Sequence, residues 1–194
     1  MKRLFVWLSA IVLAFGLVAC QVEEEPEVLP TIAEIAVDDG NFENLVAALT
    51  AAGLVGTFAD AEAGPFTVFA PNDEAFGELI ATVNFLLGDL QDGDPGFIAD
   101  LDDLVAAVGI DYVTDVLLYH VVSGAFFAED VVQVTGFNTL LDDFALSVSL
   151  VDGDVVLEGF LPASIVAVDI EASNGVIHVI DFVLLPYLPD VLTD

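Results

Sequence analysis

After Arg3 the chain contains no lysine and no arginine, and this absence limits how it can fold. The only basic side chains among 194 residues are Lys2 and Arg3, and all 33 acidic side chains follow them. No lysine or arginine salt bridge can therefore form beyond the first residues. Apolar side chains make up 57% of the sequence, which argues against a disordered acidic chain. The fold must depend on burial of these apolar side chains.

The same charge excludes classes of partner. Removal of residues 1–19 would change the formal net charge from −31 to −33, because both positive charges lie there. Nucleic acid is not expected as a partner, and neither are anionic lipid surfaces, because nothing on the chain can neutralise their charge. Two explanations of the acidity remain open: adaptation to salty surroundings, where ions screen self-repulsion, and recruitment of divalent cations.

The start of the chain has the layout of a secretory signal. Two basic residues precede an apolar run from Leu4 to Val18, and small residues lead to Cys20, the only cysteine. The last four residues, LVAC, resemble a bacterial lipobox. We therefore predict a signal peptide at residues 1–19, lipidation at Cys20, and export to the cell envelope, at its outer face or in the periplasm. The alternatives are an ordinary signal peptide or an uncleaved membrane anchor.

The remainder divides into three parts. Residues 20–30 are rich in glutamate and proline and predict an acidic tether. Residues 31–188 predict one domain, and residues 189–194 a C-terminal tail. Helical spacing of apolar residues dominates up to His120, whereas β-branched and alternating runs dominate from Val121 onward. This order predicts an α+β domain with a helix-rich first half.

Local signals place several elements. Thr31 and Glu34 have the spacing of a capping box, which predicts a helix beginning there. Asn41 and Asn72 are predicted to cap two further helices. The segment from Gly88 to Asp103 is acidic and turn-rich, and we expect a surface excursion. The DGD sequence at residues 152–154 predicts a β-hairpin.

Three stretches together resemble the fasciclin domain family. They are TVFAPNDEAF (67–76), LLYHVVSG (117–124) and NGVIHVIDFVLLP (174–186). The resemblance implies a β-wedge of two sheets with helices packed around the first half. It also implies a secreted or surface-anchored module associated with adhesion, with no established catalytic activity. Within these stretches we expect the following residues to be structural: Thr67, Phe69, Pro71, Asn72, Phe76, Asn174, Gly175 and His178.

The two histidines are candidates for chemistry. His120 and His178 both lie among aliphatic side chains, which predicts buried, neutral imidazoles bonded to backbone or side-chain partners. The alternative is a metal site, which would need a third ligand such as Asp73 or Asp181. No His-x₃-His spacing supports that alternative.

Other chemistry has weaker support. The sequence lacks a Gly-x-Ser-x-Gly motif and its cysteine is assigned to the lipid, so we do not expect an enzyme. Asp92 and Asp94 are weak calcium candidates, but this segment lacks the sixth-position glycine and closing glutamate of an EF-hand loop. We therefore expect no cofactor beyond weak calcium binding.

The resemblance also marks a candidate interaction surface. In animal members of the family, integrin contact has been placed on a tyrosine-histidine motif and an Asp-Ile pair. The matching positions here are Tyr119, His120, Asp169 and Ile170. Integrins are not expected partners of a bacterial lipoprotein, so these positions indicate a candidate interaction surface but do not identify its ligand. The alternative is that Tyr119 and His120 hold a helix end to the sheet.

These observations predict a non-enzymatic, surface-anchored binding or cell-adhesion module. Its lipid would hold it to the membrane, and its partner would be an extracellular protein or polysaccharide. The alternative is an envelope lipoprotein that binds divalent cations or a small ligand.

Stability should rise steeply with ionic strength. Folding brings carboxylates together with no lysine or arginine to offset them, and dissolved ions screen this repulsion. The melting temperature should therefore increase from low to molar salt. An unchanged melting temperature across that range would refute the prediction.

Overall fold

The structure is a computed structural model that describes residues 29–189. The predicted signal peptide, the lipidation at Cys20 and most of the tether therefore lie outside the described residues, as does nearly all of the predicted tail. No helix within residues 29–189 is long and apolar enough to cross a membrane.

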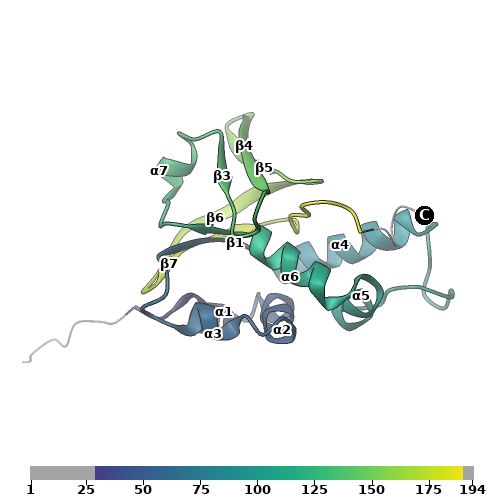
Figure 1. Cartoon of the computed structure of the whole chain (residues 1–194). Helices are drawn as coiled ribbons and strands as arrows, with labels where there is room; N and C mark the ends of the chain where they lie inside the picture. The colour runs from purple at the N-terminus through teal and green to yellow at the C-terminus, as the bar shows by residue number, and fades with distance from the viewer. Residues whose placement is uncertain (1–28, 190–194) are drawn as a thin grey trace, which may run out of the picture.

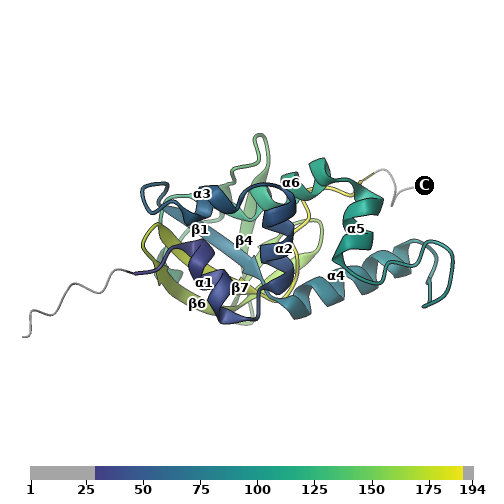
Figure 2. The same ribbon diagram turned by 90° about the horizontal axis from the view of Figure 1, so that it is seen from below.

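The helices occupy mainly the first half of the chain. They are α1 (Ile32–Asp39), α2 (Glu43–Ala51), α3 (Val55–Ala59), α4 (Asp73–Leu86), α5 (Leu101–Val108), α6 (Ile110–Tyr119) and the short α7 (Ala128–Val131). Helices α1 to α3 lie together on one side of the strands, whereas α4 to α6 extend to another side (Figures 1 and 2).

The strands come mainly from the second half. They are β1 (Phe66–Pro71), β2 (Val121–Ser123), β3 (Gly136–Asn138), β4 (Ala145–Val151), β5 (Asp154–Glu158), β6 (Pro162–Ala172) and β7 (Gly175–Ile180). Their order is β2-β1-β7-β6-β5-β4-β3. The β1–β7 pair is parallel and the others are antiparallel. The predicted α+β class with a helix-rich first half is confirmed.

The long strand β6 joins two halves of the sheet. Its first residues, Pro162 to Ser164, pair with β5, and the rest pairs with β7 with two shifts of register. An isolated bridge between Val122 and Thr139 links the two ends of the strand order, so the sheet nearly closes on itself. The two sheets of the expected wedge are thus continuous through β6.

Two apolar clusters fill the fold. The larger lies between the helices and the strands and includes Phe42, Leu45 and Phe76. The smaller lies between the two halves of the sheet, where Phe69 and Leu146 are fully buried. Full burial of such a side chain contributes about 1.5–3 kcal/mol. Because lysine and arginine salt bridges are absent, these clusters supply the main favourable free energy of folding.

Short-range caps were predicted correctly in two cases out of three. Thr31 and Glu34 form the capping box of α1, and Asn72 caps α4 by accepting from the Ala75 amide at 2.9 Å. The prediction for Asn41 was wrong, because the N-cap of α2 is Phe42, which makes no side-chain cap. The carboxylate of Asp73 instead accepts the amides of residues 43 and 44, at 3.2 and 2.8 Å. A residue thirty positions away cannot be recognised as a cap from local spacing.

Two turn-rich segments were predicted, at residues 152–154 and from Gly88 to Asp103. The DGD hairpin joins β4 to β5, with positive φ at Asp152 and Gly153 as a type I′ turn requires. The acidic segment from Gly88 is largely turns, but α5 already begins at Leu101. Ile98 in this segment is buried, and its backbone amide and carbonyl both form hydrogen bonds with the side chain of Asn84 on α4. These bonds attach the segment to α4, so it is not wholly a surface excursion.

Asn174 connects the helical side to the sheet. Its Oδ1 accepts from the amide of Ile32 at 2.9 Å, and its Nδ2 donates to the carbonyls of Phe58 and Asp60 at 2.9 and 3.0 Å. The next residue, Gly175, has no room for a side chain, because a Cβ there would lie 2.0 Å from the Phe66 carbonyl oxygen. The predicted turn pair therefore also fastens α1 and α3 to β7.

Replacement of Asn174 by alanine should strongly destabilise the fold. One amide and two carbonyls would lose buried partners, and each such loss costs about 1–3 kcal/mol. We expect the free energy of unfolding to fall by at least about 3 kcal/mol in urea titrations. The matched control is Asn41→Ala, because Asn41 is exposed and its side chain bonds only that of Asp39. Equal losses in the two variants would contradict this role for Asn174.

Candidate functional site

His120 lies at the C-terminal end of α6, where it connects the helix to the segment after β7. Its Nδ1 donates to the Val116 carbonyl at 2.6 Å, and its Nε2 accepts from the Leu184 amide at 2.9 Å. The ring is 2% exposed. Burial lowers the pKa of His120 to about 4, and the hydrogen bond to Val116 opposes this shift more weakly. The imidazole is therefore neutral near pH 7.

His178 on β7 is also fully buried, with the opposite arrangement of its ring nitrogens. Its Nε2 donates to the Phe126 carbonyl at 2.8 Å, and its Nδ1 accepts from the Asp169 amide at 3.4 Å. The ring stacks on Phe69, with 5.7 Å between the centroids. His178 on β7 thus holds Phe126, after β2, and Asp169, where the register of β6 shifts, to the centre of the sheet.

These contacts occupy all four ring nitrogens of the two histidines. Every ring nitrogen is bonded to backbone, so none is free to bind a metal ion. The proposed third ligands are engaged as well, since Asp73 caps α2 and Asp181 accepts from the Ser164 amide at 2.7 Å. Within residues 29–189, no three side chains of histidine, cysteine, aspartate or glutamate form a group that could hold a metal ion.

The calcium candidates Asp92 and Asp94 lie on the exposed acidic segment. The Asp94 carboxylate accepts from the backbone amide of Gln91 at 2.9 Å and so stabilises a turn. This contact gives the carboxylate a structural role in the loop.

The structure does not bring the four candidate interaction residues to one surface. Tyr119 and His120 are 4% and 2% exposed, and the Tyr119 hydroxyl donates to the Ala145 carbonyl at 3.3 Å. Asp169 is exposed, and its carboxylate accepts from the Ala128 amide at 2.7 Å. Ile170 is half-buried against the helical cluster. On the folded domain a partner can therefore reach Asp169 freely, but not the tyrosine-histidine motif.

The first family stretch holds neighbouring segments together. The Thr67 hydroxyl donates to the Gly124 carbonyl at 2.7 Å and accepts from the Phe126 amide at 2.9 Å. Phe69 and Phe76 are buried in the two clusters, and Pro71 ends β1. These contacts give the named residues of this stretch a structural role.

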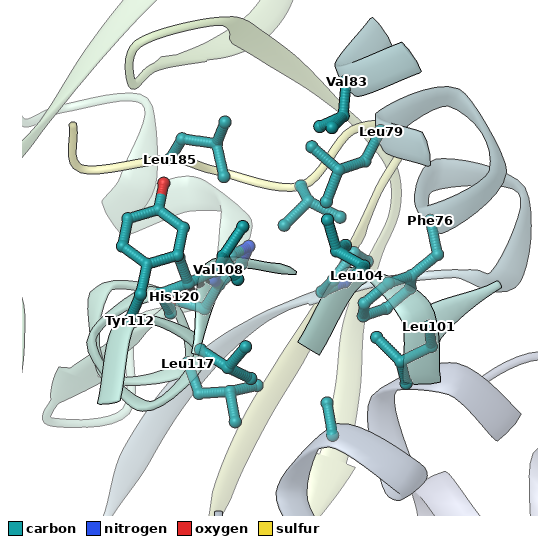
Figure 3. A pocket seen from close by; sticks show the side chains of 15 residues that line it. Phe76, Leu79, Val83, Leu101, Leu104, Val108, Tyr112, Leu117, His120 and Leu185 are labelled. Atoms are coloured by element: carbon teal, nitrogen blue, oxygen red, sulfur yellow. Dashed lines mark hydrogen bonds between the residues drawn. The ribbon is translucent and has the colours of Figure 1, made fainter. Parts of the chain in front are cut away.

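An apolar cavity of about 40 Å³ lies between α4, α5, α6 and residues 183–185. Figure 3 shows Leu79 and Leu104 on one side and Leu117 and Leu185 on the other, with His120 in the wall. Pockets for metabolites typically measure about 300–1,000 Å³ and contain several converging polar groups. This cavity is therefore a gap in core packing and not a site for a metabolite.

The end of the described chain is fastened over this cavity. The Tyr112 hydroxyl donates to the Tyr187 carbonyl at 2.6 Å, and the Tyr187 hydroxyl donates to the Asp115 carboxylate at 2.7 Å. The hydrogen bond to Asp115 is the main cause that raises the pKa of Tyr187 to about 12. Sequence reasoning missed this clamp, because no local pattern connects residues more than seventy positions apart.

The burial of His120 should make stability depend on pH. Its folded pKa of about 4 lies below its unfolded value of 6.5, so its contribution is full above pH 6.5 and is lost as the pH falls toward 4. This loss should reach about 3 kcal/mol. The measurement is the free energy of unfolding in urea as a function of pH, at constant molar salt, for the wild type and for His120→Gln, whose glutamine does not titrate.

As the pH falls, protonation of surface carboxylates relieves repulsion between them and stabilises the fold. This effect opposes the loss from His120, and it is shared by the wild type and His120→Gln. The difference in unfolding free energy between them therefore isolates His120, and it should shrink as the pH falls. Parallel pH profiles would show that His120 does not titrate in this way.

Comparison with known proteins agrees with this architecture. A sequence model of the Fasciclin domain matches residues 40–186. "Uncharacterized protein sll1735" from Synechocystis is 36% identical over 157 residues, which cover 81% of this chain and 98% of that protein. "Protein sll1483" from the same organism is 38% identical over 156 residues, which cover 80% and 73% of the two chains.

A solved structure shows the same fold. It is a FAS1 domain pair from the insect cell adhesion molecule Fasciclin I, with a TM-score of 0.62 and 18% identity. The match covers 81% of this chain and 51% of that chain. The three stretches of resemblance lie in the family match and form the β1–α4 connection, the end of α6 and strand β7. This chain belongs to the fasciclin domain family.

Proposed function

We propose that this protein is a non-enzymatic binding and adhesion module, held at the outside of a bacterial cell by a lipid on Cys20. The observation that carries the proposal is membership of the fasciclin family, whose fold also occurs in an insect cell adhesion molecule. The two bacterial relatives are consistent with a bacterial source.

The chemistry of the domain supports a non-enzymatic role. General acid–base catalysis most often uses histidine, and both histidines of this chain are buried and bonded to backbone. Lysine and arginine are absent beyond Arg3, so neither can stabilise a developing negative charge. The binding function therefore belongs to the surface of the domain.

The sequence before the domain supports the anchor. A signal-like layout ends at Cys20, and α1 begins at Ile32, so a short acidic tether separates the two. The acidic surface makes nucleic acid and other polyanions unsuitable partners. The small apolar cavity does not favour the alternative of a protein that captures a small ligand.

Display of the full chain on cells should test both parts of this proposal. Cells that express the wild-type chain should retain it in their membrane fraction and adhere more strongly to envelope or matrix material in high salt. Cys20→Ser should release the chain from that fraction and abolish the gain in adhesion, because the lipid attachment point is lost.

The outcomes separate anchoring from adhesion. Retention of Cys20→Ser in the membrane fraction would contradict the lipid anchor. Displayed wild-type chain that gives no gain in adhesion over cells without it would contradict the adhesion role. Ser123→Ala provides a control for expression, because Ser123 is exposed at the end of β2.

A further inference from the structure

An open groove of about 670 Å³ lies on the outer face of strands β4, β5 and β6. The strand register places Ser149, Val156 and Ser164 in one row across the three strands. The neighbouring Leu157 points to the other face and is fully buried in the core between the halves of the sheet. The row therefore faces outward, and the groove is a surface feature separate from the small internal cavity.

The groove has an apolar floor. Val156 and Phe182 contribute half-buried side chains, and Pro162 contributes an exposed ring. Aliphatic and aromatic surfaces of this kind can pack against an apolar face of a ligand. The floor thus provides contact area that does not depend on charge.

The polar side chains that line the groove are carboxylates and hydroxyls. Glu158 and Asp181 are exposed carboxylates, of which Asp181 uses one oxygen to accept the Ser164 amide. The Ser149 Oγ is buried and has no hydrogen-bond partner within the described residues. A hydroxyl left in this state is uncommon in folded proteins, and the residue that carries it lines the groove.

The apolar floor, the carboxylates and the hydroxyls of the groove together limit which ligands can bind there. The carboxylates repel anions and accept hydrogen bonds, so the ligand must be uncharged or cationic and must carry donors. A cationic peptide would be attracted to the acidic surface in general, and charge alone gives it no preference for the groove. A neutral sugar carries many hydroxyl donors beside an apolar C–H face, and both match what the groove presents.

We propose that the groove between Glu158 and Phe182 binds a neutral saccharide chain. This inference rests on the proposed binding function and names the class of its partner. The groove is open along the surface, which suits a chain that passes through it more than a small molecule that must be enclosed.

The position of the groove fits a domain attached through its N-terminal side. The β4–β5 hairpin lies on the side of the strands opposite α1 to α3 (Figure 1). A module tethered before α1 would therefore present this face away from its anchor, where an extracellular saccharide can reach it.

The test uses the full chain in detergent, with immobilised neutral hexasaccharides of glucose, galactose and mannose as probes in molar salt. We expect the chain to bind at least one of these probes. Glu158→Ala and Ser149→Ala should each weaken that binding at least fivefold. Ser149→Ala should do so without lowering the melting temperature, because it removes an unpaired buried hydroxyl.

Matched controls are Glu171→Ala on β6 and Ser147→Ala on β4, which are exposed residues of the same types that do not line the groove. Both should bind like the wild type. Absence of binding to every neutral probe would overturn the proposal, as would equal losses in groove and control variants. Tighter binding of an oligolysine peptide that competes at Glu158 would also overturn it. Adhesion that persists in any of these cases would leave the proposed function standing.

Discussion

The parallel pairing of β1 with β7 is the contact on which the rest of the structure depends. It joins segments more than one hundred residues apart, from Phe66 opposite Gly175 to Pro71 opposite Ile180. Close approach of the strands requires glycine at 175, and the preceding Asn174 binds the helical side. The two apolar clusters lie on either side of this pair, which therefore organises both the helices and the second half of the sheet.

Buried amide, hydroxyl and imidazole side chains connect the elements of this protein in the absence of lysine and arginine. Asn174, His120, His178, Thr67 and Asn84 are all buried, and each bonds backbone from a distant segment. Such bonds avoid the cost of desolvating a charge. They also explain why the family motifs contain polar residues, since each of these side chains bonds backbone. The carboxylates can consequently remain at the surface, where water and salt screen them.

Features that depend on neighbours in sequence were predictable, and features that depend on distant partners were not. The caps at Thr31 and Asn72 and the hairpin turn at Asp152 follow from local spacing, because their hydrogen bonds close within a few residues. The expected cap at Asn41 failed because Asp73, brought close by tertiary packing, supplies the bonds at the start of α2. Local sequence left two alternatives for Tyr119, an interaction surface or a contact between helix end and sheet, and its burial with the hydroxyl bonded to β4 corresponds to the second.

The helix-rich and strand-rich halves, the family and the acidic character can all be read from the sequence, because periodicity, motif and composition are properties of the chain alone. Which polar residues are structural and which remain accessible depends on contacts between segments that are distant in sequence. His120 and His178 have the same chemistry as any catalytic histidine until backbone from other segments covers both nitrogens of each ring. The groove likewise arises from the register of three strands, and register is set by packing that no single segment contains.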